Sequence, residues 1–285
     1  MSDANFATFA SDYVVIMSAP NGARRTTAQH AAVPVTPSQL AAAARALLDE
    51  QVAVLHMHVR DDDQQHSLDV DRYRAAIAAV EAAVGDALII QVTTEAVGRF
   101  NRQQQMTTVR DLRPEAVSLA LRELCPDEAA EVEAAEFFQW LVRERIWAQY
   151  ILYSAADVRR FESLRVRGFF GEEHPFAMLV LGAYGSGQHG EVIDLDTQLA
   201  AAEYSQFPWA VCCFGPNENA AAVHATELGG HVRLGFENNL VLADGSVAAD
   251  NASLIRQYRQ SLDKHGCARA PARAIDIRQH WLENA

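Results

Sequence analysis

The chain has 285 residues, of which 49% are hydrophobic, so it is long enough to bury a sizeable core. Its formal net charge of −13 disfavours nonspecific binding to nucleic acid or to anionic membrane surfaces, because both need basic patches. No apolar run reaches the roughly 18 residues that suggest a membrane-spanning helix, and the amino terminus lacks a signal-peptide pattern. We therefore expect a cytoplasmic protein with no membrane or nucleic-acid partner.

Short β-rich runs alternate with Ala- and Leu-rich helical segments along the chain. Strands are predicted over residues 13–19, 52–58, 87–93, 116–121, 147–153, 176–182, 209–214 and 231–236. Helices are predicted over residues 38–50, 72–84, 127–145, 154–164, 195–205, 217–228 and 251–266.

Strand and helix alternating eight times over about 250 residues is typical of an α/β fold of the TIM (β/α)8 barrel type. A doubly wound open sheet is the alternative, but no Gly-rich phosphate-binding fingerprint follows the first strand. No long linker divides the chain. We therefore expect a single domain over residues 1–285, with a barrel core over about residues 13–265 and a C-terminal extension.

The second predicted strand ends in the sequence VLHMHVRD, residues 54–61. Because side chains alternate faces along a strand, His56, His58 and Arg60 share one face, which points inward in a barrel. The carboxyl end of each barrel strand opens at the catalytic rim. Two imidazoles in this relation favour a transition metal, most often zinc, although such a pair also occurs merely hydrogen-bonded.

The eighth predicted strand, in HVRLGFENN (231–239), offers a third ligand. Arg233, Gly235 and Glu237 share a parity, and in a closed barrel this strand is separated from the second only by the first. Glu237 can therefore complete a His-His-Glu set, while Gly235 leaves room for a ligand. Arg233 supplies a cation suited to a carboxylate, unless it pairs with an acidic side chain such as Glu95.

These motifs resemble one known family. The segments SAPNGARRTT, PVTPSQLAAAARAL, VAVLHMHVRD, GGHVRLGFENNL and DNASLIRQY together resemble the β-keto acid cleavage enzymes, which include 3-keto-5-aminohexanoate cleavage enzyme. The resemblance extends over nearly the whole chain, from about residue 14 to about residue 262.

The resemblance implies a TIM barrel with one zinc ion per chain, held at the positions of His56, His58 and Glu237. It also implies that the enzyme exchanges a β-keto acid with acetyl-CoA to give acetoacetate and a new acyl-CoA. Zinc would act as a Lewis acid and Arg233 would stabilise developing negative charge. A homo-oligomer, a tetramer or a dimer, is expected for the same reason.

The chain departs from the family pattern at several catalytic-rim positions. The fourth strand ends in ALRELC, where many relatives carry Asn and small residues, so Arg122 and Glu123 are expected to line the rim. The family commonly has an Asp directly after the zinc-binding Glu, where this chain has Asn238, and an amide cannot serve as a carboxylate base. Glu95, at the end of the third strand, is the substitute candidate for a base, although a salt bridge to Arg60 or Arg233 explains it equally well. These changes indicate a different keto acid and leave open whether the chemistry is retained.

Five further residues are candidates for substrate binding. Asn21 follows the first strand and either binds substrate or fixes the turn, and Arg60 lies above the histidines. Thr93 and Thr94 end the third strand, where they can bond a carboxylate. Gly185, in GAYGSGQ after the sixth strand, can let backbone amides approach CoA.

Two other functions compete with this one. An amidohydrolase-like hydrolase also uses an HxH pair on a barrel strand, but there the pair ends the first strand. A metal-dependent protein that binds acids but has lost turnover through Asn238 is the other alternative.

Overall fold

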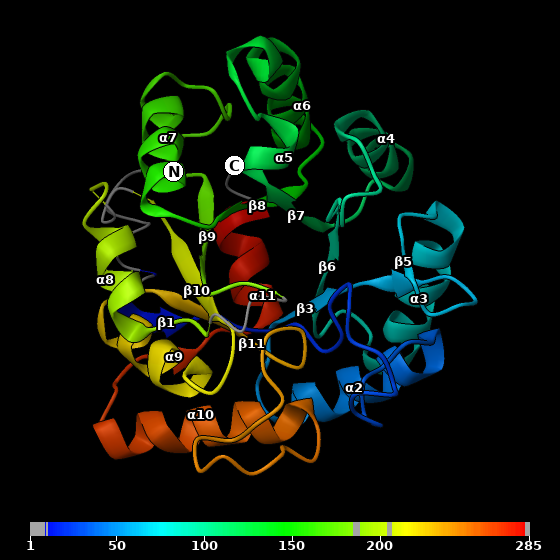
Figure 1. The fold of residues 1–285 in the computed structure, drawn as a ribbon, viewed down its shortest axis with the longest axis vertical. Coiled ribbons are helices and arrows are strands. Elements are labelled where there is room, and N and C mark those ends of the chain that lie inside the picture. Colours follow the sequence, from blue (N-terminus) through cyan, green and yellow to red (C-terminus); the bar gives the residue numbers. More distant parts are fainter. Residues whose placement is uncertain (1–8, 10, 185–188, 204–206, 283–285) are drawn as a thin grey trace.

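In the computed structural model of the chain, residue 9 and residues 11–184, 189–203 and 207–282 are described. Parallel strands form a closed eight-stranded barrel, with helices around its outside (Figure 1). In order around the barrel the strands are β10 (Trp209–Cys213), β11 (His231–Leu234), β2 (Ile16–Ser18), β3 (Val54–Met57), β6 (Ile89–Thr93), β7 (Ala116–Ala120), β8 (Trp147–Leu152) and β9 (Phe176–Leu181). The predicted TIM barrel is confirmed.

Each predicted strand contains one barrel strand, but the first two predicted runs are broken. The first run divides into β1 (Tyr13–Val14), which leaves the barrel, and β2. The second ends as a barrel strand at Met57, and β4 (Val59–Arg60) then pairs antiparallel with β5 (His66–Ser67). His58 lies in the break between β3 and β4.

The helices cover the barrel and are mostly amphipathic. They are α2 (Pro37–Asp49), α3 (Val70–Val84), α4 (Arg102–Leu112), α5 (Leu121–Leu124), α6 (Glu131–Arg143) preceded by η1 (Glu128–Ala130), α7 (Ala155–Val166), α8 (Val192–Leu199), α9 (Glu218–Glu227) and α10 (Asn251–His265). Among the described residues, no helix is both long and apolar enough to span a membrane.

Two of these helices, the short α5 and the longer α4, were not predicted from the sequence. The missed α4 has a physical explanation. It begins with a capping box in which Asn101 and Gln104 satisfy each other's backbone amides. Its buried face includes Gln105 and Thr108 as well as Met106 and Val109. Because polar side chains occupy half of the buried face, the apolar period that marks an amphipathic helix is absent from the sequence.

Side chains alternate between two packed layers, as the strand period requires. On β3, Leu55 and Met57 pack in the outer layer against the helices, while Val54 belongs to the barrel interior. His56 has the parity of Val54 and is 1% exposed. The inward parity predicted for the first histidine of the HxH pair is therefore confirmed.

The residues after α10 close the amino-terminal end of the barrel. The strand β12 (Ala270–Pro271) pairs with β1, and α11 (Ala274–Ile277) is seen through the barrel in Figure 1. In the following turn η3 (Arg278–Leu282), Trp281 stacks on Trp147 of β8, with ring centroids 5.3 Å apart. This apolar plug leaves the opposite, carboxyl-terminal end as the end where polar groups converge.

Candidate metal centre and active site

Barrel closure brings the ends of β11, β2 and β3 side by side. β2 pairs with β11 on one side and with β3 on the other. The turn after β11 is tied to the end of β2, since the Glu237 amide donates to the Ala19 carbonyl at 3.0 Å. Two segments almost 180 residues apart in the chain thereby present His56, His58 and Glu237 to one point.

The side-chain ligand atoms of these three residues form a tight triangle. His56 Nε2 lies 3.1 Å from His58 Nε2. Each of these nitrogens lies 3.4 Å from Glu237 Oε2. The three residues are between 1% and 5% exposed, so the triangle is closed off from bulk water.

This triangle fits a divalent transition cation. Four ligands placed tetrahedrally at about 2.0–2.1 Å from zinc are about 3.3–3.4 Å from one another, close to the spacing found here. Glu237 Oε2 has no hydrogen-bond partner within the described chain. Burial also lowers the pKa of His58 to about 4, although the charge of Glu237 acts to raise it. His58 is therefore neutral at neutral pH, as a metal ligand must be.

Neighbouring polar groups orient two of the three side chains. His56 Nδ1 lies 2.8 Å from Gln91 Oε1, so the ring donates there and directs the lone pair of Nε2 into the triangle. Arg233 Nη2 contacts the other carboxylate oxygen of Glu237, Oε1, at 3.3 Å. It also donates to Cys212 Sγ at 3.2 Å, which fixes the guanidinium from behind.

The charge balance of the site depends on Arg233. Burial on its own raises the pKa of the Glu237 carboxyl, but Arg233 and the two histidines hold that pKa well below its usual range. Glu237 is consequently a carboxylate, and Arg233 is the cation beside it. The two form an i, i+4 ion pair, with the Arg233 side chain 3% and the Glu237 side chain 7% exposed.

Two candidates for substrate binding, Asn21 and Arg60, form hydrogen bonds to backbone groups of the protein. The Asn21 amide donates to the carbonyls of Pro34 and His58 and accepts from the His58 amide, so it fixes the loop that carries His58. Arg60 donates to the carbonyls of Gly22, Ala23 and Arg25. Its hydrogen bonds hold the loop after β2 in place, and it does not line the cavity described below.

The role predicted for Gly235 is corrected by the backbone. Its φ is +145°, and a Cβ there would lie 2.4 Å from the Ala19 carbonyl oxygen. Glycine is therefore needed for the close approach of the turn to β2, and not to leave room for a ligand. The buried Glu218 accepts from the Gly235 amide at 2.9 Å and from the Asn239 side chain at 3.2 Å, which anchors the same turn.

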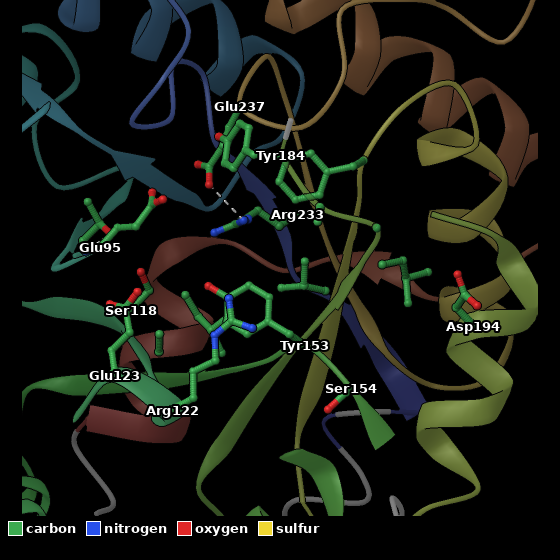
Figure 2. A pocket seen from close by; sticks show the side chains of 18 of the residues that line it. Glu95, Ser118, Arg122, Glu123, Tyr153, Ser154, Tyr184, Asp194, Arg233 and Glu237 are labelled. Atoms are coloured by element: carbon green, nitrogen blue, oxygen red, sulfur yellow. Dashed lines mark hydrogen bonds and ion pairs between the residues drawn. The ribbon is translucent and has the colours of Figure 1, made fainter. Parts of the chain in front are cut away.

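A cavity of about 750 Å³ opens beside the triangle at the carboxyl end of the barrel. Figure 2 shows Arg233, Glu237 and Tyr184 on one side of it and Glu95 on the other. Burial, together with the charges of Glu237 and Glu123, raises the pKa of Glu95 to about 7. A carboxyl group that titrates near neutrality and faces a candidate metal site is suited to proton transfer.

The remaining predicted residues fall in different places. Thr93 lines the cavity, and its hydroxyl oxygen accepts from the Glu95 amide at 3.1 Å. Thr94 is buried and donates to Gln105, outside the cavity lining. Asn238 is 1% exposed, and neither atom of its side-chain amide has a partner in the described part of the chain. Gly185 lies outside the described residues.

Two further residues near the triangle were not selected from the sequence. Gln91 has the inward parity of its strand, and a Gln in the apolar run ALIIQVT is the signal that could have found it. Ser118 lines the cavity, and its buried hydroxyl has no partner among the described residues. Arg122 and Tyr153, which the sequence places at the rim after the fourth and fifth strands, both line the cavity, and Arg122 lies over the Tyr153 ring, 3.5 Å from its centroid (Figure 2).

Solved structures support the fold. The chain resembles ObcA in its binary complex with oxaloacetate, with a TM-score of 0.70 and 17% identity, over 87% of this chain and 67% of that chain. It also resembles a type I 3-dehydroquinate dehydratase from Clostridium difficile, with a TM-score of 0.57 and 10% identity, over 90% and 95% of the two chains. At these identities the similarity concerns the barrel alone.

Relatives found by sequence and a family profile show more than the fold. A 3-keto-5-aminohexanoate cleavage enzyme from Fusobacterium nucleatum is 25% identical, over 86% of this chain and 89% of the relative. A 3,5-dioxohexanoate:acetyl-CoA acetone transferase from Paraburkholderia graminis is 27% identical, over 88% and 90%. A 3-oxoadipate:acetyl-CoA acetyltransferase from Cupriavidus necator is 25% identical, over 88% and 92%. The profile of the beta-keto acid cleavage enzymes matches residues 13–280, and the chain belongs to that enzyme family.

Proposed function

We propose that this protein is a zinc-dependent β-keto acid cleavage enzyme that uses acetyl-CoA as its second substrate. The keto acid R–CO–CH2–COO⁻ and acetyl-CoA are converted to R–CO–S-CoA and acetoacetate. The acyl group R–CO moves to the CoA sulfur, and the acetyl group joins the CH2–COO⁻ fragment. Every atom of the two substrates is recovered in the two products.

One observation carries the proposal, namely the buried triangle of His56 Nε2, His58 Nε2 and Glu237 Oε2 at the barrel mouth. Two imidazoles and one carboxylate are the ligand set of many catalytic zinc sites that keep a position open for substrate. The names of relatives such as the acetyltransferase from Cupriavidus necator supply the class of reaction.

Arg233 stabilises negative charge in this scheme. Bound zinc would supply Lewis-acid polarisation of the keto acid's oxygen atoms. The Arg233 guanidinium lies at the cavity wall, bonded to Cys212 and Glu237, so it is already oriented before substrate enters. A fixed cation facing a developing enolate stabilises the transition state without reorganisation.

Glu95 is the base that removes a proton from the carbon between the two carbonyl groups. It faces Arg233 and Glu237 across the cavity, and its backbone is fixed by His66, whose Nε2 lies 3.0 Å from the Glu95 carbonyl. Thr93, beside it, is left to contact the substrate carboxylate with its hydroxyl. Because Asn238 has no titratable proton, the carboxyl of Glu95 takes over the base function that an Asp at that position would serve.

Two finer points belong to the same proposal. We infer a homo-oligomer, a tetramer or a dimer, and a location in the cytoplasm, where acetyl-CoA is available. The resemblance to the family supports the oligomer, and the use of acetyl-CoA supports the location.

A coupled assay with a panel of β-keto acids tests the function directly. Purified protein loaded with zinc should form acetoacetate and a new acyl-CoA from at least one acid, and only when acetyl-CoA is present. Acetoacetate and acyl-CoA are quantified by mass spectrometry. Acid cleavage without CoA would support the hydrolase, and zinc-loaded protein without turnover on any acid would support the acid-binding alternative.

Variants of the ligands and of Arg233 separate metal binding from chemistry. His56→Ala and His58→Ala should each lose stoichiometric zinc, because two ligands in a buried site cannot hold the ion against exchange with buffer. Arg233→Gln should keep zinc and lose turnover by about 100-fold or more, since it removes only a stabilising charge. Metal content is measured by plasma mass spectrometry. Full zinc occupancy in His58→Ala would rule out the ligand assignment.

The pH profile should report Glu95. Its carboxyl pKa is raised to about 7, so the basic form is scarce below that pH and predominates above it. We expect kcat/KM to rise with pH through an apparent pKa near 7 and then level off. Glu95→Gln should abolish this rise of kcat/KM with pH and lower kcat by about 100-fold or more. Identical pH profiles in the wild type and Glu95→Gln would exclude Glu95 as the base.

A further inference from the structure

A second chamber of about 500 Å³ lies next to the substrate cavity. It lies between the loop after β2 and the residues that follow Glu237. Arg25, Asn238 and Val241 line it but do not line the first cavity. Tyr184 and Phe214 line both, so the two spaces adjoin along these aromatic side chains.

The second chamber lacks the groups that the proposed function assigns to the keto acid. None of the three candidate metal ligands lines it, nor do Glu95 and Arg233, which face the first cavity. A two-substrate exchange nevertheless needs a place for the second reactant with a path to the metal centre. The shared wall at Tyr184 gives the chamber that path.

Two arginines line this chamber, and one of them, Arg24, also lines the first cavity, where its charge acts to lower the pKa of Glu95. Arg24 lies over the Tyr184 ring, 5.2 Å from its centroid, and Arg25 has a buried Nε with no hydrogen bond. Neither guanidinium forms an ion pair within the described residues. In a chain of net charge −13, two adjacent unpaired arginines at the barrel mouth favour an anionic ligand such as a phosphate.

The interior of the chamber suits an amide-bearing chain. Asn238 lies in its wall. Within the described residues, its amide nitrogen and amide oxygen both lack partners, as does the buried Tyr184 hydroxyl. Phe214, Leu240 and Val241 supply apolar surface around them. A buried amide with both hydrogen-bonding atoms unpaired is costly, and a ligand amide can pair with both atoms at once.

We propose that this chamber holds the pantetheine arm of the acyl-CoA, and that Arg24 and Arg25 bind the phosphate groups at the end of that arm. This inference rests on the proposed function, since it assigns a place to the second substrate. It gives Asn238 a role in binding the cosubstrate, at a position where an Asp would place a negative charge in the chamber wall.

Calorimetric binding of CoA and of pantetheine, which lacks the nucleotide and its phosphates, tests the assignment. Arg25→Ala should raise the Kd for CoA about tenfold, flatten its salt dependence and leave the Kd for pantetheine unchanged. Asn238→Ala should weaken both ligands at unchanged zinc content. Arg74→Ala is the matched control, because Arg74 pairs with the exposed Asp71 on the outer helix α3.

The outcomes separate this assignment from the proposed function. If Arg25→Ala binds CoA with the affinity and salt dependence of the wild type, the chamber is not the CoA site, whatever the activity. If the wild type binds no CoA, the assignment is also wrong. If CoA binds as expected but no acid is cleaved, the assignment of the chamber to CoA is supported and the proposed function is wrong. In an active enzyme, the KM for the keto acid should be the same in Arg25→Ala as in the wild type.

Discussion

Closure of the barrel is the constraint on which the site depends. Only a closed sheet places the end of the last strand beside the first and thus within reach of the second. His56, His58 and Glu237 meet within 3.4 Å because β11 and β3 both pair with β2. Burying a carboxylate is costly unless it is paired, and here the ion pair between Arg233 and one oxygen of Glu237 offsets that cost.

Much of this centre was predictable from local rules. The two-residue period of a strand gives the inward parity of His56, and the strand count implies the closure that brings Glu237 to it. Of the two roles left open for Asn21, its hydrogen bonds agree with fixing the backbone. The contacts of Arg60 were not predictable, because they depend on the path of the loop after β2. The role predicted for Gly235 from strand parity was also wrong. Glycine is required there because the backbone of Ala19 lies too close for a side chain, and the sequence does not reveal that contact. The helix α4 escaped prediction because its buried face is half polar.

The two adjoining spaces carry different kinds of side chain. The cavity beside the triangle is lined by Arg233, which can stabilise negative charge, and by Glu95, which can transfer a proton. The chamber behind Tyr184 carries two arginines without ion pairs and an amide without hydrogen-bond partners among the described residues. In the proposed function Glu95 acts in the first space, whereas Asn238 lines the second. Glu218 anchors the turn that carries both Glu237 and Asn238, since it accepts from the Gly235 amide and the Asn239 side chain.

The central claim concerns a single ion in this centre. Anomalous diffraction from crystals of the zinc-loaded protein, recorded above and below the zinc absorption edge, tests it most directly. The account predicts one strong difference peak per chain, within coordination distance of His56 Nε2, His58 Nε2 and a Glu237 carboxylate oxygen. A map with no peak among these three side chains, or with the peak at another set of residues, would contradict it.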